Sequence, residues 1–92
     1  MAKYKLIFTE RSVKDLKNLE KQVAKRIVDK LGFFTEQTDP LSFADKLKNP
    51  KFGTYKFRIG TYRAIFDIDK DSNVTILLVL TIKHRKEVYK DI

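Results

Sequence analysis

The chain has 92 residues, no cysteine and a net charge of +8, which corresponds to a pI near 9.8. This length favours one domain over residues 1–92, and the missing cysteines exclude disulfides and thiolate metal sites, as expected for a cytosolic protein. The longest apolar run, residues 76–80, is far shorter than the ~20 residues of a membrane span, so neither secretion nor membrane insertion is expected. The excess of lysine and arginine predicts attraction to phosphate polymers or to acidic protein segments.

The first part of the chain predicts a strand followed by two helices. Residues 3–8 alternate between polar and apolar side chains, as a strand does. Thr9 offers an N-cap oxygen, and apolar residues then recur at three- and four-residue steps as far as Leu31, the spacing of an amphipathic helix. One helix of this length is unusual in so small a chain, so we expect a helical hairpin broken between residues 18 and 21, with Gly32 near its end.

Three strands are predicted after a loop that extends from Thr38 through Pro50. Residues 54–59 and 62–68 alternate, and Gly60 lies between them, which predicts a hairpin. Residues 74–82 are apolar at successive positions, as expected for a central strand that is covered on both faces.

Residues 83–89 are expected to leave the sheet as a short helix or coil. The complete order predicts an α+β domain with an N-terminal strand, a helical hairpin and a three-stranded antiparallel meander. The helices are expected to cover one face of a twisted sheet.

The segment from Tyr55 to Tyr89 predicts a basic, aromatic-edged surface for a polyanion, and RNA is the favoured one. A nuclease that uses no metal must deprotonate the ribose 2′-OH, neutralise the phosphorane and protonate the 5′-oxygen. Arg58 and Arg63, expected on one face of the hairpin, suit phosphate because guanidinium groups bind its oxygens bidentately; the alternative is two solvated arginines. His84, the single histidine, suits proton transfer near neutral pH, or is an ordinary surface residue.

Further residues are expected to hold the bases and backbone of RNA. Tyr89 is predicted to stack on a base, a contact that contributes roughly 1–3 kcal/mol, whereas Tyr62 is expected in the core because it is in register with Ala64 and Phe66. The histidine and the scattered carboxylates show no metal-ligand spacing, so neither a metal nor another cofactor is expected. The lysines expected to follow the RNA backbone are Lys46, Lys48, Lys51 and Lys56.

Three segments resemble the RelE family of toxin–antitoxin systems, within the RelE/ParE superfamily, over essentially the whole chain. They are residues 4–8 with the helical hairpin, residues 53–63 (GTYKFRIGTYR) and residues 83–89 (KHRKEVY). The resemblance implies a ribosome-dependent mRNA endoribonuclease that inhibits translation by cleaving the codon in the ribosomal A site. Attack by the 2′-OH would leave a 2′,3′-cyclic phosphate. It also implies a RelB-like antitoxin, which would wrap the toxin, cover its groove and assemble with it as a heterotetramer.

The resemblance also implies roles for individual positions. His84 corresponds to the acid of the YoeB-like branch, and Asp45 lies near the position of that branch's carboxylate base. The base stays open between Asp45, Lys56 and a water assisted by nearby cations. The other implied roles are phosphate contact by Arg58 and Arg63, a catalytic lysine at Lys56, basic tail residues at Arg85 and Lys86, and a tyrosine near the C-terminus at Tyr89.

Two other functions are compatible with this resemblance. One is a ParE-like toxin that inhibits DNA gyrase without catalysis of its own, and the other is an inactive relative that only binds an antitoxin. Relatives of the first kind generally lack basic and proton-transfer residues on the sheet, so Arg58, Arg63 and His84 favour the nuclease.

Overall fold

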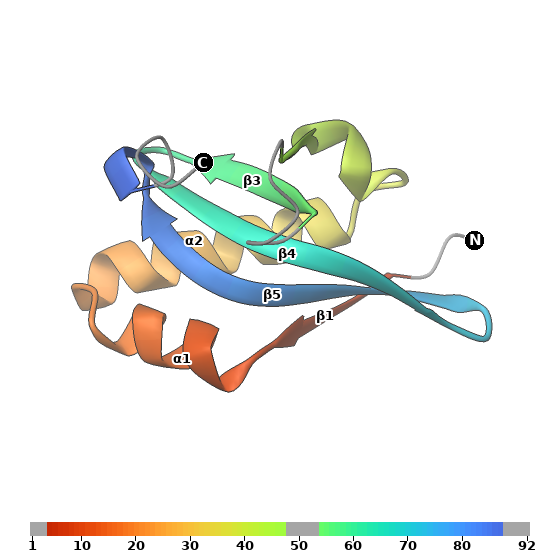
Figure 1. The fold of residues 1–92 in the computed structure, drawn as a ribbon, viewed down its shortest axis with the longest axis horizontal. Coiled ribbons are helices and arrows are strands. Elements are labelled where there is room, and N and C mark those ends of the chain that lie inside the picture. Colours follow the sequence, from red (N-terminus) through yellow and green to blue (C-terminus); the bar gives the residue numbers. More distant parts are fainter. Residues whose placement is uncertain (1–3, 48–53, 88–92) are drawn as a thin grey trace.

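The computed structural model describes residues 4–47 and 54–87, which form a five-stranded sheet with both helices on one face (Figure 1). The elements are β1 (Tyr4–Phe8), α1 (Glu10–Lys17), α2 (Lys21–Thr35), the 3₁₀ turn η1 (Pro40–Phe43), β2 (Ala44–Lys46), β3 (Tyr55–Ile59), β4 (Tyr62–Asp71) and β5 (Val74–His84). The strand order is β1-β5-β4-β3-β2, with β1 parallel to β5 and the other neighbours antiparallel. The predicted α+β class, with helices on one face of the sheet, is confirmed.

The helical hairpin has its break where the sequence predicts it. Thr9 caps α1, because its hydroxyl oxygen accepts a hydrogen bond from the Ser12 amide at 3.2 Å. The expected end near Gly32 is wrong, because α2 continues to Thr35 in order to bury Phe34. In the described part of the chain, neither helix combines the length and the apolar composition that crossing a membrane requires.

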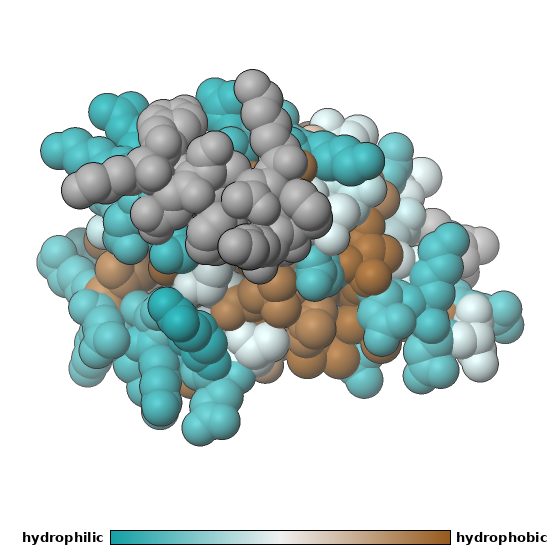
Figure 2. All heavy atoms as spheres, in the orientation of Figure 1, coloured by the Kyte–Doolittle hydropathy of each residue, from teal (hydrophilic) through white to brown (hydrophobic). Residues whose placement is uncertain are grey.

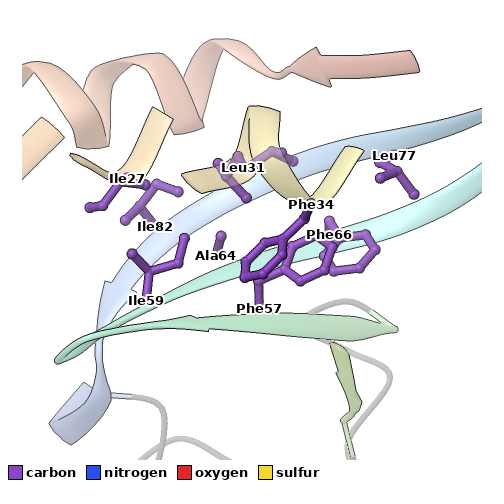
Figure 3. Packing of buried hydrophobic residues seen from close by; sticks show 10 residues of the cluster. Ile27, Leu31, Phe34, Phe57, Ile59, Ala64, Phe66, Leu77 and Ile82 are labelled. Atoms are coloured by element: carbon purple, nitrogen blue, oxygen red, sulfur yellow. The ribbon is translucent and has the colours of Figure 1, made fainter. Parts of the chain in front are cut away.

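A stack of three phenylalanines joins α2 to the sheet (Figure 3). The ring centroids of Phe34 and Phe57 are 4.6 Å apart, and those of Phe57 and Phe66 are 4.4 Å apart. Tyr62 packs against the same core cluster, as predicted. Because side chains alternate along β3 and β4, the buried aromatic residues send their neighbours Lys56, Arg58 and Arg63 to the opposite, outer face of the sheet.

The loop predicted from Thr38 through Pro50 is wrong over part of its length. Residues 40–43 form η1, and residues 44–46 form β2, which adds a fifth strand at the edge of the sheet beside β3. A strand of three residues is too short to show an alternating pattern, so its sequence carries no signal of its own. Its pairing with β3 is what places Asp45 directly opposite Lys56.

A β-bulge in β5 exchanges the two faces of that strand near its end. Phe66 pairs with Val79 and Ile65 pairs with Thr81, so Leu80 is an extra residue without a partner in β4. Leu77, Val79 and Ile82 consequently all lie in the core, although strict alternation would send Ile82 to the other face. The strand therefore presents Lys83, rather than His84, on the outer face.

The side chain of Asp15 in α1 binds the edge of β5 where that strand extends beyond the end of β1. Its Oδ2 accepts hydrogen bonds from the Thr81 hydroxyl and, at 3.0 Å, from the Ile82 amide. These donors would otherwise be left without partners at a half-buried strand edge. The contact ties α1 to the segment that follows the bulge.

We predict that Asp15→Ala lowers the free energy of unfolding by about 1–3 kcal/mol, because two donors lose their acceptor. Asp29→Ala is the matched control, since Asp29 lies on the exposed side of α2 in a surface ion pair with Lys25. It should change the free energy by less than about 0.5 kcal/mol. Urea unfolding followed by circular dichroism measures both, and equal losses would contradict the role given to Asp15.

Candidate functional site

Three cations from three strands form a row across the outer face of the sheet. Arg58 in β3 pairs directly with Arg63 in β4, and Arg63 pairs directly with Lys83 in β5. Since neighbouring strands are about 4.8 Å apart, the row brings three positive charges within about 10 Å of one another along the backbone. The prediction that Arg58 and Arg63 share a face is confirmed. Like charges placed directly opposite each other destabilise a sheet, so a row of this kind favours an anion as its ligand.

The two arginines differ sharply in exposure. The Arg58 side chain is 68% exposed, whereas Arg63 is only 5% exposed. Arg63 Nη1 donates to the carbonyl oxygens of Gly60 at 2.9 Å and Tyr62 at 2.8 Å. Gly60 has φ +61°, a left-handed conformation that a tight turn requires and that glycine adopts without strain. Arg63 therefore holds the β3–β4 turn, while Arg58 projects its guanidinium toward solvent.

The buried guanidinium of Arg63 keeps one polar atom available. Its Nε is buried and has no hydrogen-bond partner within the part of the chain that the structure describes. A buried donor of this kind is costly unless something occupies it. Arg63 is the central member of the cation row, and its charge adds to the positive potential there although its side chain is buried.

Asp45 and Lys56 lie beside this row on the same outer face. They face each other across β2 and β3, and Asp45 Oδ2 is 3.9 Å from Arg58 Nη1 in a largely exposed ion pair. The structure thus brings together two of the residues predicted to act as base and the exposed arginine. The pairing follows from β2, which the sequence did not reveal.

His84 lies on the other side of the sheet, so the expectation that it sits beside the basic face of the hairpin is wrong. It pairs with Tyr62, and the two rings meet edge to face with centroids 5.5 Å apart. Its Nδ1 accepts a hydrogen bond from the Lys86 amide at 3.2 Å, so Nε2 carries the proton in the neutral ring. The bulge at Leu80 is the cause, because it shifts every later residue of β5 to the opposite face.

Lys83 is the residue that the sequence prediction missed. Strict alternation from Val79 would have placed Lys83 on the helix-covered face, and no local signal marks the extra residue. A bulge is set by the pairing of β4 with β5, which are distant in sequence.

The remaining predicted RNA contacts are scattered. Arg85 and Lys86 are exposed in a helical segment, residues 85–87, that follows β5. The Arg85 amide ties this segment to the hairpin by donating to the Thr61 carbonyl at 2.7 Å. Lys46 is exposed on β2 and pairs with Tyr55, on the face opposite Asp45. The residues that lie outside the described part of the chain are Lys48, Lys51 and Tyr89.

Comparison with known proteins identifies the family. Residues 6–89 match the model of the ParE toxin of the type II toxin–antitoxin system parDE. The chain is 29% identical over 87 residues to Toxin RelG of Mycobacterium tuberculosis, an alignment that covers 95% of this chain and 97% of that toxin.

Solved structures give the same result. A chain of the toxin–antitoxin complex RelBE2 of Mycobacterium tuberculosis superposes with a TM-score of 0.71 at 27% identity, covering 90% of this chain and 99% of that one. The RelE–RelB complex of Pyrococcus horikoshii gives a TM-score of 0.63 at 25% identity, with 92% and 97% covered. The chain therefore belongs to the ParE toxin family of type II toxin–antitoxin systems. Within the RelE/ParE superfamily its similarity to RelG and to the RelBE complexes confirms the predicted RelE-type toxin.

The difference in exposure between the two arginines predicts a difference in reactivity. Phenylglyoxal should modify Arg58 rapidly and Arg63 slowly, because the reagent needs access to the guanidinium and Arg63 is buried. Mass spectrometry of proteolytic peptides after timed exposure measures both rates, with the exposed Arg11 of α1 as the internal control. Modification of Arg63 at the rate of Arg11 would show that the turn does not enclose its side chain.

Proposed function

We propose that the chain is a ribosome-dependent mRNA endoribonuclease of the cytoplasm, which inhibits translation by cleaving mRNA in the ribosomal A site. The observation that carries the proposal is the row formed by Arg58, Arg63 and Lys83. Three adjacent like charges repel one another across the strands, whereas the phosphorane formed by 2′-OH attack is stabilised by such a set of cationic donors. The similarity to RelE-type toxins supports this assignment.

In the proposed reaction, the outer face places the scissile phosphate over the row. The 2′-oxygen forms a bond to phosphorus while the bond from phosphorus to the 5′-oxygen breaks, which leaves a 2′,3′-cyclic phosphate and a free 5′-hydroxyl. Arg58 contacts the non-bridging oxygens through its exposed guanidinium. Arg63 contributes its charge from the middle of the row and keeps the turn, and with it Arg58, in position.

We assign the base to Asp45, with Lys56 beside it. A carboxylate next to the Arg58 guanidinium lies within reach of a 2′-OH whose phosphate that arginine holds, and it can take the proton as attack proceeds. Lys83 stands on the outer face at the opposite end of the row. We therefore assign to Lys83, instead of His84, the donation of a proton to the departing 5′-oxygen.

We further propose that a RelB-like antitoxin is the partner, and that it inhibits the toxin by covering the outer face of the sheet. Beside the cation row, the same face carries Ile7, Ile76 and Leu78, which are only half-buried and meet across β1 and β5. An apolar area over these strands is visible in Figure 2. An amphipathic segment with acidic residues would bury the apolar area and neutralise the row, and the relatives of known structure are toxin–antitoxin complexes.

The nuclease assignment predicts that Arg58→Ala lowers the rate of cleavage on programmed ribosomes by about 10²–10³-fold, because a donor to the phosphorane is lost. Arg11→Ala, which removes an exposed arginine from α1, should leave the rate nearly unchanged. Primer extension on mRNA held with a defined codon in the A site measures the cleavage. If the Arg58 variant cut as fast as the wild type, the row would not be the site.

The placement of Lys83 and His84 on opposite faces predicts that only one of them matters for the leaving group. Lys83→Ala should lower the cleavage rate by about 10²-fold, whereas His84→Ala should change it far less. The same ribosome assay, run over pH 6–9, compares the two variants. A larger loss for the His84 variant would return the proton transfer to histidine and contradict the assignment.

Inhibition of DNA gyrase without catalysis is the second candidate, since the matching family model is that of ParE toxins. A chain that traps gyrase on DNA and leaves ribosome-bound mRNA intact would establish it. An inactive relative would bind its antitoxin without arresting growth in either way.

A further inference from the structure

A second basic surface lies on α2, on the side that faces away from the sheet. Ile27, Leu31 and Phe34 turn one side of α2 into the core. The solvent side borders an open hollow of about 490 Å³. Its lining residues are Gln22, Lys25, Arg26, Asp29, Lys30 and Phe33. Because the helices cover one face of the sheet, this hollow and the cation row lie on opposite sides of the molecule (Figure 1).

The hollow combines cations with an exposed aromatic ring. Lys25, Arg26 and Lys30 are all exposed, and the single carboxylate among them, Asp29, lies 3.7 Å from Lys25 in a surface ion pair. Phe33 is 48% exposed, and the Lys30 ammonium lies 5.0 Å from the centre of its ring. Phe33 also meets Phe34 and Phe43 edge to face, with ring centroids 6.0 and 6.4 Å apart, yet about half of its surface stays open to solvent.

These features fit unpaired nucleotides of a folded RNA better than other anions. A charged helix face is usually just solvated, and the contacts with Phe34 and Phe43 use one part of the Phe33 ring, but its exposed remainder lies among cations. A nucleobase stacks on such a ring while lysines follow the backbone, which is the usual composition of single-stranded RNA sites. An acidic peptide would use the cations but would gain nothing specific from a flat aromatic surface.

The dimensions of the molecule separate this surface from the proposed cleavage face. The shortest principal extent of the fold is 22 Å, nearly three times the ~8 Å over which salt screens charges at physiological ionic strength. An mRNA strand lying across Arg58 and Lys83 therefore neutralises little of the charge on α2. A second RNA segment is needed to occupy it.

We propose that the solvent side of α2 binds ribosomal RNA, with Phe33 stacking on an unpaired base and Lys25, Arg26 and Lys30 contacting phosphates. The inference rests on the proposed function for the identity of the RNA. It adds that the toxin holds the ribosome through α2 while its sheet receives the mRNA. Docking and cleavage then belong to different faces and can be separated by mutation.

The test measures binding of the purified full chain to ribosomes that carry no mRNA. The triple variant Lys25→Gln/Arg26→Gln/Lys30→Gln should bind at least about tenfold more weakly at ~0.1 M salt, and the slope of log K against log salt should become shallower by about 2. The matched control, Arg11→Gln/Lys14→Gln/Lys17→Gln, removes the same charge from exposed positions of α1 and should change both quantities much less. Phe33→Leu should weaken binding roughly fivefold or more without changing the slope.

Three results would overturn the inference: wild-type affinity of the α2 triple variant, equal losses in the α1 control, or displacement by polyglutamate or duplex DNA as efficient as by a ribosomal RNA fragment. Circular dichroism confirms that each variant is folded.

Failure of the proposed function can be distinguished from failure of this inference. A chain that binds vacant ribosomes through α2 but leaves programmed mRNA intact would refute cleavage and keep this surface, whereas cleavage with an α2 variant of unchanged affinity would refute only this surface.

Discussion

The pairing of β4 with β5 is the constraint from which the arrangement of the outer face follows. These two strands are the longest in the chain, and one extra residue, Leu80, interrupts their register. Before the bulge, odd-numbered residues of β5 fill the core; after it, Ile82 does so. A strand without the bulge would have to expose Ile82 or break its pairing. The exchange of faces that keeps Ile82 buried is the same exchange that places Lys83 beside Arg63 and sends His84 to Tyr62.

The aromatic stack gives this arrangement its rigidity. Phe34, Phe57 and Phe66 fix β3 and β4 against α2, and a backbone held in this way can keep three cations adjacent despite their repulsion. Arg63 contributes to the same rigidity, since its Nη1 joins two carbonyls of the tight turn at Gly60. A charge that stabilises a turn and also belongs to the proposed phosphate site would couple folding to function, so its substitution would affect both. Arg58 is exposed, so its substitution would affect the proposed function without affecting the stability of the turn.

The parts of the fold that the sequence predicted are those with local signals. Thr9 as a cap, the break between residues 18 and 21 and the turn at Gly60 all depend on residues within a few positions of one another. The parts that it did not predict, β2 and the bulge, are defined by pairing with strands elsewhere in the chain.

The residues of the candidate site likewise divide into those placed by local signals and those placed by pairing between distant strands. Arg58 and Arg63 flank a two-residue turn, so their common face could be predicted from the hairpin alone. Lys83 and Asp45 join them only through the non-local pairing of β5 and β2. The prediction of His84 beside the basic face assumed that the chain leaves the sheet after residue 82, whereas β5 continues to His84 and its bulge turns Lys83 to the outer face.

The distribution of charge has a consequence for how an antitoxin would act. The outer face offers an apolar area around Leu78 next to a cation row, and an acidic amphipathic segment bound there would neutralise that row. The α2 surface lies on the other side of the molecule, whose shortest principal extent of 22 Å exceeds the effective range of screened charges. Neutralising the outer face therefore leaves the potential around Lys25, Arg26 and Lys30 nearly intact. Inhibition by such a partner would arise from covering the proposed cleavage face, and if α2 binds RNA as proposed, the inhibited complex would keep a salt-dependent affinity for folded RNA.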